Sequence, residues 1–167
     1  MTKKESISYE DGTYVGEIDE LGNRHGFGVM KYFDGVVYEG QWQNDEFCGN
    51  GVLSYPEAGT YTGEFKNGQK HGYGVRTSVV GVTYEGQWQY DLMWGHGIMK
   101  FPGGDFYEGQ WEKNQRSGFG KSQSAKGLFI YEGQWKDDKY NGEGILKSSN
   151  GRVIHQGLFK DGKAVKN

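Results

Sequence analysis

The chain has 167 residues, of which 30 are glycine and 16% are aromatic, and its formal net charge at pH 7 is -3. Disordered chains are poor in aromatic residues and carry a high net charge, so this composition argues against disorder. Because the chain has only two prolines and no glycine at every third position, collagen is excluded as well. An ordered chain rich in glycine and aromatic residues indicates β-structure.

Cysteine use and hydropathy indicate a cytoplasmic protein. The single cysteine, Cys48, cannot build a disulfide framework, which favours a reducing compartment. The lysines at the N-terminus are not followed by the apolar run of a signal peptide. No apolar stretch approaches the roughly 18 residues that a membrane span needs. The length is that of about one domain.

Residues 1–13 are expected to be an N-terminal half repeat that adds one cap strand. The segment Tyr9–Tyr14 resembles Tyr55–Tyr61, which closes one of the repeats that follow. Terminal units of repeat arrays are commonly atypical in this way, because they cover the end of the array.

Residues 14–167 are occupied by a repeat of 23 or 24 residues. Each complete unit begins with the pattern aromatic-x-Gly-x-aromatic, as in Tyr84–Trp88, except that the first unit has Ile18 at the last place. Each unit continues with Gly-x-Gly, as in Gly95–Gly97. The complete units start at Tyr14, Tyr38, Tyr61, Tyr84, Tyr107 and Tyr131, and a partial unit starts at His155.

Each unit is predicted to be one β-hairpin. Side chains alternate along a strand, so Tyr84, Gly86 and Trp88 share one face and the residues between them form a polar face. Between the strands, Asn67-Gly68 favours the positive φ of a tight turn. A glycine between two aromatic residues removes a side chain, which allows a neighbouring ring to lie flat on the strand.

The repeat closely resembles the MORN (membrane occupation and recognition nexus) family, with about six complete copies. The resemblance implies an all-β fold: an elongated, single-layer, twisted antiparallel β-meander of stacked hairpins. It also implies a binding or scaffolding role, because MORN arrays occur in cytoskeletal, ciliary and membrane-contact proteins. A cytoplasmic location in association with the cytoskeleton or a cilium follows as an expectation. Because the repeats fill most of the given residues, we do not expect a catalytic domain beside the array.

Catalysis and metal binding are not expected. His25, Cys48 and His71 occupy equivalent positions of successive units, but such positions lie two strands apart, or roughly 10 Å. Zinc ligands lie about 2.0–2.3 Å from the metal, so these side chains cannot converge on one ion. The carboxylates of Glu17 and Glu64 are separated in the same way and cannot form an acid–base pair. We therefore expect no enzyme activity, no metal and no cofactor.

The fifth unit departs from the pattern. It carries Lys121–Ser124, with the sequence Lys-Ser-Gln-Ser, where other units have an aliphatic residue, Met or Leu, and an aromatic residue. A strand this polar is expected to bend, or to face solvent on both sides.

The turn of the fourth unit is the first candidate for a partner site. It is apolar, with Tyr90, Leu92, Met93 and Trp94, whereas the other complete units have polar turns. Four large apolar side chains at an exposed hairpin end would form a patch typical of interaction sites. The alternative is that this turn folds back over the sheet.

The aromatic column is the second candidate. Trp42, Trp88, Trp111 and Trp135 recur at the same position of their units and are interpreted first as core residues. If their face stays partly open as a groove, it could accept a peptide or an amphipathic helix.

Charge is distributed unevenly along the chain. Residues 1–110 hold 8 Lys and Arg against 16 Asp and Glu, whereas residues 111–167 hold 11 against 6. The basic end could bind anionic phospholipid, or the acidic end of a second copy, or it could be an ordinary solvated surface. A sequence pI of 5.8 gives no support to nucleic-acid binding. The candidate lipid-binding residues are Lys113, Arg116, Lys121, Lys126, Lys139 and Lys147.

Two functional hypotheses follow. The first is a non-catalytic scaffold or adaptor that binds a partner peptide or helix along its aromatic groove, in a cytoskeletal or ciliary assembly. The alternative is a peripheral membrane module that uses the basic C-terminal third. Open edge strands at the two ends could also pair two copies end to end.

Overall fold

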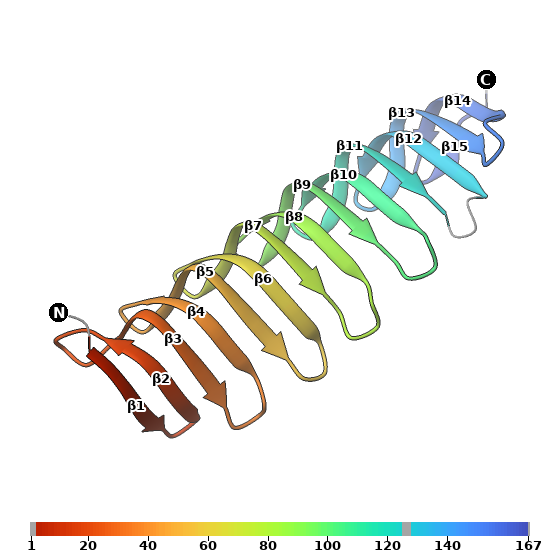
Figure 1. Cartoon of the computed structure of the whole chain (residues 1–167). Coiled ribbons are helices and arrows are strands. Elements are labelled where there is room, and N and C mark those ends of the chain that lie inside the picture. Colours follow the sequence, from red (N-terminus) through yellow and green to blue (C-terminus); the bar gives the residue numbers. More distant parts are fainter. Residues whose placement is uncertain (1–2, 125–127, 167) are drawn as a thin grey trace. The chain divides into compact units, whose positions relative to one another are not determined.

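The computed structural model describes residues 3–124 and 128–166, and within these ranges the only regular elements are β-strands (Figure 1). Consecutive strands are neighbours in an antiparallel sheet whose order follows the chain from β1 to β15, so the predicted all-β meander of hairpins is confirmed. The strands are β1 (Lys3–Tyr9), β2 (Gly12–Ile18), β3 (Arg24–Tyr32), β4 (Val37–Gln43), β5 (Glu46–Tyr55), β6 (Gly59–Lys66), β7 (Gln69–Thr77), β8 (Thr83–Gln89), β9 (Leu92–Lys100), β10 (Phe106–Glu112), β11 (Gln115–Gln123), β12 (Phe129–Lys136), β13 (Lys139–Ser148), β14 (Val153–Lys160) and β15 (Lys163–Ala164).

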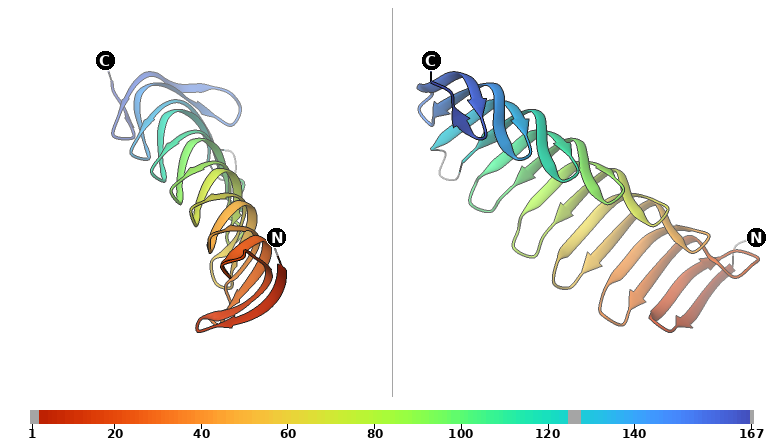
Figure 2. Two further views of the ribbon diagram at one scale, coloured as in Figure 1. Left: turned by 90° about the vertical axis from the view of Figure 1, so that its left-hand side faces the viewer. Right: turned by 180° about the vertical axis from the view of Figure 1, so that it is seen from behind.

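The strands belong to two compact units. The first unit comprises residues 1–79 and 88–91, and the second comprises residues 80–87 and 92–167. Figure 2 shows that the strands curl along their length. None of the residues that the structure describes lies in a helix long and apolar enough to cross a membrane.

The core lies on one face of the sheet, which we call the inner face. Along β4, Tyr38 and Trp42 are 0% and 2% exposed, and the glycine between them is buried, while the alternate residues are exposed. β8 and β10 repeat this alternation, as the two-residue period of the sequence predicts. The core is therefore aromatic, and the opposite, outer face carries polar residues together with exposed aromatic residues such as Phe27 and Phe119.

The recurrent glycines allow the tyrosine rings to lie on the backbone. A Cβ atom placed on Gly109 would lie 2.6 Å from Oη of Tyr107 and 2.5 Å from Cα of Gly120 on the neighbouring strand. The same crowding surrounds the corresponding glycines of the other complete repeats. The prediction that glycine makes room for an aromatic ring is confirmed.

The Glu/Gln column of the outer face is structural. The pairing register of β10 and β11 shifts after Gly109, because Gly118 and Phe119 form a bulge. The bulge frees the N–H of Phe119, which donates to Oε1 of Gln110 at 2.7 Å. Equivalent bonds run from the central residue of Gly-x-Gly to Oε1 of Glu17, Gln41, Glu64, Gln87 and Gln134.

The hairpin turns link each repeat to the one before it. Asn67 and Gly68 both have positive φ, 50° and 75°, as predicted for a two-residue turn. The second turn residue also donates its backbone N–H to the preceding hairpin, as Asp45 does to the carbonyl of Arg24 at 3.1 Å. Asp138 bonds the carbonyl of Arg116 in the same way at 3.2 Å.

The polar strand of the fifth repeat behaves only in part as expected. β11 pairs with β10 on one side and with β12 on the other, and both ladders continue to Gln123. Residues 121–124 are half-buried. The ladders do not break at the polar residues, because the backbone pairs with both neighbouring strands. The strand nevertheless meets solvent on both faces, since Ser122 lines an open cavity and the side chain of Lys121 is 45% exposed.

The buried tyrosines predict a loss of stability at high pH. Burial raises the pKa of Tyr14 and of Tyr131 to about 12, and it raises the pKa of Tyr38, Tyr61 and Tyr107 as well. An unfolded tyrosine ionises near pH 10. The unfolded state therefore loses these protons first, so their contribution is complete below about pH 10 and falls as the pH rises toward about 12.

Circular dichroism and phenolate absorbance, recorded together during an alkaline titration, check this prediction. We expect the buried tyrosines to ionise only as the β-signal disappears. If all the tyrosines ionise while the β-signal is still complete, their burial does not couple ionisation to folding.

Candidate functional site

The inner face of the second unit contains an open groove, which we call the inner groove. It consists of two adjoining cavities of about 340 and 360 Å³ that share Phe101, Tyr107 and Arg116. The first cavity is also lined by Met93, Met99, Trp111, Asn114 and Asp138, and the second by Asp105, Phe106, Ser122, Gln123, Ser124 and Tyr140.

The groove opens because the fifth repeat lacks an apolar side chain beside its tyrosine. Tyr107 pairs directly with Met99 of β9 and with Ser122 of β11. In the first unit, Tyr38 pairs with Met30 and Leu53, which are 0% and 6% exposed. A serine in place of leucine leaves a gap on the inner face, which explains the second cavity.

Arg116 is the cation of the groove. Its Nε donates to Oδ1 of Asp138 at 2.9 Å, and its Nη2 donates to the backbone carbonyl of Asp138 at 3.0 Å. The guanidinium also lies 4.5 Å from the ring centre of Trp135 and 5.7 Å from that of Tyr107. These contacts fix the orientation of a charge whose side chain is still 32% exposed.

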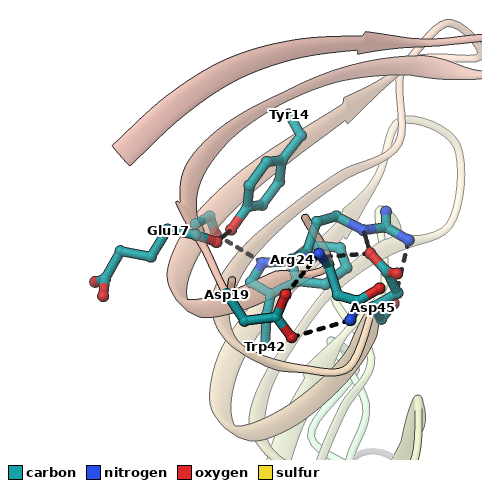
Figure 3. Close-up of polar contacts among 8 residues, drawn as sticks. Tyr14, Glu17, Asp19, Arg24, Trp42 and Asp45 are labelled. Carbon is teal, nitrogen blue, oxygen red and sulfur yellow. Dashed lines mark hydrogen bonds and ion pairs between the residues drawn. The ribbon is translucent and has the colours of Figure 1, made fainter. Parts of the chain in front are cut away.

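The arginine belongs to a two-repeat pattern that the sequence interpretation missed. Arg24, Lys70 and Arg116 stand 46 residues apart, and each pairs with an aspartate of the next turn, at 2.9, 3.3 and 2.9 Å. Figure 3 shows the first pair, Arg24 with Asp45, beside Trp42. The intervening repeats have an apolar residue at this position: Phe47, Met93 and Tyr140. Comparing every second repeat would have revealed this alternation.

The predicted tryptophan column is part of the core. Trp42, Trp88, Trp111 and Trp135 are 2–6% exposed. Each indole Nε1 donates to a glycine carbonyl at 3.1–3.2 Å, and that glycine lies in the preceding repeat. The indole rings therefore offer a partner little area, although Trp111 borders the inner groove.

The predicted patch of the fourth turn is divided. Met93 lines the inner groove, and strand alternation directs Leu92 and Trp94 to the outer face. Tyr90 is 62% exposed, and its ring centre lies 5.9 Å from that of His71. Leu92, Met93 and Trp94 therefore do not form a single apolar surface.

The predicted lipid-binding residues are also divided. Arg116 is on the inner face and is paired with Asp138, whereas Nζ of Lys121 lies 3.1 Å from Oε1 of Glu132 on the outer face. Lys113 and Lys139 are exposed, Lys147 is half-buried, and Lys126 lies outside the described residues. The described members of this set do not share one basic surface.

Metal ligands are not assembled in the described part of the chain. Across residues 3–124 and 128–166, no three His, Cys, Asp or Glu side chains are placed to hold one ion.

Comparison with protein families finds the MORN repeat at residues 20–37, 38–59, 61–83, 84–106, 107–129 and 131–151. No curated protein matches the chain. Among solved structures, the chain is similar to the SAS-4 (dCPAP) TCP domain of Drosophila melanogaster, which was solved in complex with a proline-rich motif of Ana2 (dSTIL). The two sequences are 18% identical, the match covers 90% of this chain and 86% of that chain, and the TM-score is 0.48.

Proposed function

This chain belongs to the MORN repeat family, and on that premise we propose that it is a non-catalytic interaction module that binds a segment of a partner protein in the inner groove. The proposed setting is the cytoplasm, in a cytoskeletal or ciliary assembly, and this setting rests on the family alone. Imaging of the tagged chain against markers of both assemblies tests it.

One observation carries the proposal, namely that the inner face of the second unit is open and apolar. Met93 and Met99 are half-buried there, and Phe101 is 41% exposed. The counterparts of Met99 in the first two repeats, Met30 and Leu53, are buried. Phe101 is about as exposed as its counterpart Tyr55, which is 37% exposed. Concave sites lined by apolar side chains with a few polar groups are typical binding sites, and flexible thioethers adapt to different partner side chains.

Replacing Met99 with glutamate is expected to abolish capture of peptides in this groove. A displayed library of random peptides is selected on the wild-type chain, and the affinities of the enriched peptides are then measured for the variant. A carboxylate on the apolar floor loses its hydration when a peptide covers it, so the affinity should fall by at least about tenfold.

The matched control is Leu21→Glu, which adds the same charge at a side chain that is 87% exposed in the first unit. We expect this control to bind peptides like the wild type, and thermal melts of both variants verify their folding. Equal peptide binding by the Met99 variant would contradict the proposal.

The membrane alternative is tested by co-sedimentation with vesicles that contain anionic phosphatidylserine. The division of the basic residues between two faces argues against it, so we expect no sedimentation at physiological salt. Binding to these vesicles that is equal for the wild type and the Met99 variant would favour the membrane alternative.

A further inference from the structure

The second cavity of the inner groove, of about 360 Å³, is large enough to admit an apolar side chain. It lies beside Ser122, where every other complete repeat has a larger residue such as Leu53 or Met99. It also borders Ser124, where three repeats have an aromatic residue such as Tyr55 and the third and sixth repeats likewise have serine. The rings of Phe101, Tyr107 and Tyr140 line the same cavity. A bulky apolar or aromatic side chain from a partner would therefore replace the packing that the fifth repeat lacks.

Arg116 offers a hydrogen-bonding edge beside this gap. A guanidinium has five N–H donors, and the bonds to Asp138 use Nε and Nη2. Nη1 makes no hydrogen bond with the residues that the structure describes. The edge formed by Nη1 and the second Nη2 proton therefore remains open, and its geometry suits a carboxylate that accepts two parallel bonds.

The charge of the second unit agrees with an acidic ligand. This unit has 12 Lys and Arg against 9 Asp and Glu, whereas the first unit has 7 against 13. A net positive unit attracts an acidic segment during encounter. However, Asp105 also lines the second cavity and repels carboxylates near it. A single carboxylate beside Arg116 therefore fits better than a run of acidic residues.

We propose that the occupant of the inner groove is a segment of a partner protein with one bulky apolar side chain next to one carboxylate. The apolar side chain fills the gap at Ser122 and Ser124, and the carboxylate binds the open edge of Arg116. This inference rests on the proposed function and names the ligand class for the same groove.

The preceding repeat indicates which substitution tests whether Arg116 binds the carboxylate of the partner segment. Met93 occupies the position of Arg116 one repeat earlier. The backbone N–H of Met93 donates to Oδ1 of Asn114 at 2.8 Å. The backbone N–H of Arg116 donates in the same way to Oδ1 of Asp138 at 3.0 Å. The double variant Arg116→Met/Asp138→Asn therefore copies a combination that this fold already contains. It removes the cation and leaves no unpaired aspartate behind.

The most enriched peptide of the random library is synthesised with its acidic residue and again with the matching amide, Gln for Glu or Asn for Asp. On the wild-type chain, we expect the acidic peptide to bind at least about tenfold more tightly than its amide. On the double variant, the two peptides should bind equally. The control Arg24→Met/Asp45→Asn makes the same change in the first unit and should leave the preference intact.

Ser122→Leu tests the apolar part. A leucine stands at the equivalent position, Leu53, so the fold accommodates it, and it fills the gap. We expect the enriched peptide to bind this variant at least about tenfold more weakly than the wild type. A peptide whose bulky apolar residue is replaced with alanine should bind the variant and the wild type with equal affinity.

The outcomes separate the two proposals. The inference is overturned if the enriched peptides carry no acidic residue or carry basic residues instead. It is also overturned if the Arg116→Met/Asp138→Asn variant still prefers the acidic peptide to its amide. If Met99→Glu still abolishes their binding, the proposed function stands without it. If the wild-type chain enriches no peptide, both proposals fall.

Discussion

Replacing Gly109 with alanine is expected to lower the free energy of unfolding by about 3 kcal/mol, at the upper end of the usual cost of overpacking. The added Cβ would lie 2.5 Å from Cα of Gly120, 2.6 Å from Oη of Tyr107 and 2.7 Å from the carbonyl oxygen of Phe119. Two of these neighbours are backbone atoms of the paired strand, which cannot move without breaking the ladder. Denaturant unfolding followed by circular dichroism measures the loss.

Gly104→Asn is the control. Gly104 has a φ of +90°, and a Cβ added there would meet none of the described residues within 4 Å. Asparagine also tolerates a left-handed backbone better than other residues that carry a side chain. We expect a loss below about 1 kcal/mol. If Gly109→Ala costs no more than the control, close contact between the tyrosine ring and the glycines does not limit stability.

Replacing Trp42 with alanine is expected to cost about 3–5 kcal/mol, as is typical of a buried tryptophan. The indole packs edge-on against Tyr14 and Tyr38, with ring centres 5.3 and 5.1 Å away. It donates to the carbonyl of Gly28 at 3.1 Å, and the guanidinium of Arg24 lies 4.4 Å from its centre. The substitution removes all of these contacts and leaves a cavity between two repeats.

Trp42→Phe separates ring packing from hydrogen bonding. Phenylalanine occupies the same column at Phe65, where it is 4% exposed and packs against Tyr38 and Tyr61. We therefore expect a loss of about 1–2 kcal/mol, chiefly the bond to Gly28 and its unsatisfied carbonyl. Chemical denaturation of both variants measures the difference. Equal losses would mean that the hydrogen bond, rather than the ring, dominates.

The core was predictable from the sequence because it depends on a local period. Tyr84, Gly86 and Trp88 share a face through strand alternation alone, and the recurring glycines identified the space that the rings occupy. The turn at Asn67-Gly68 was predictable for the same reason, since its positive φ values depend on two adjacent residues.

The groove was not predictable, because it depends on which residues pair across strands. From the sequence, Ser122 was expected to alter only its own strand. In the structure it leaves space beside Tyr107, which lies 15 positions earlier in the sequence. The two residues pair because the bulge shifts the register between β10 and β11. In that bulge the N–H of Phe119 donates to Oε1 of Gln110, and the Glu/Gln column to which Gln110 belongs looks in the sequence like ordinary solvated side chains. The fourth turn misled for a related reason: Met93 and Trp94 are adjacent in sequence but point to opposite faces.

The alternation of paired cations and apolar residues determines how such an array can change in length. Arg24 meets Asp45, and Lys70 meets Asp91, whereas Phe47 meets the turn glycine Gly68. If one repeat were deleted directly after Arg24, the turn that contains Gly68 would take the place of the turn that contains Asp45. Arg24 would then face a glycine, and its charge would have no carboxylate partner. Deleting two repeats would bring it opposite Asp91 and restore the pair. The chain can therefore grow or shrink by gene duplication or deletion without an electrostatic penalty only in steps of two hairpins.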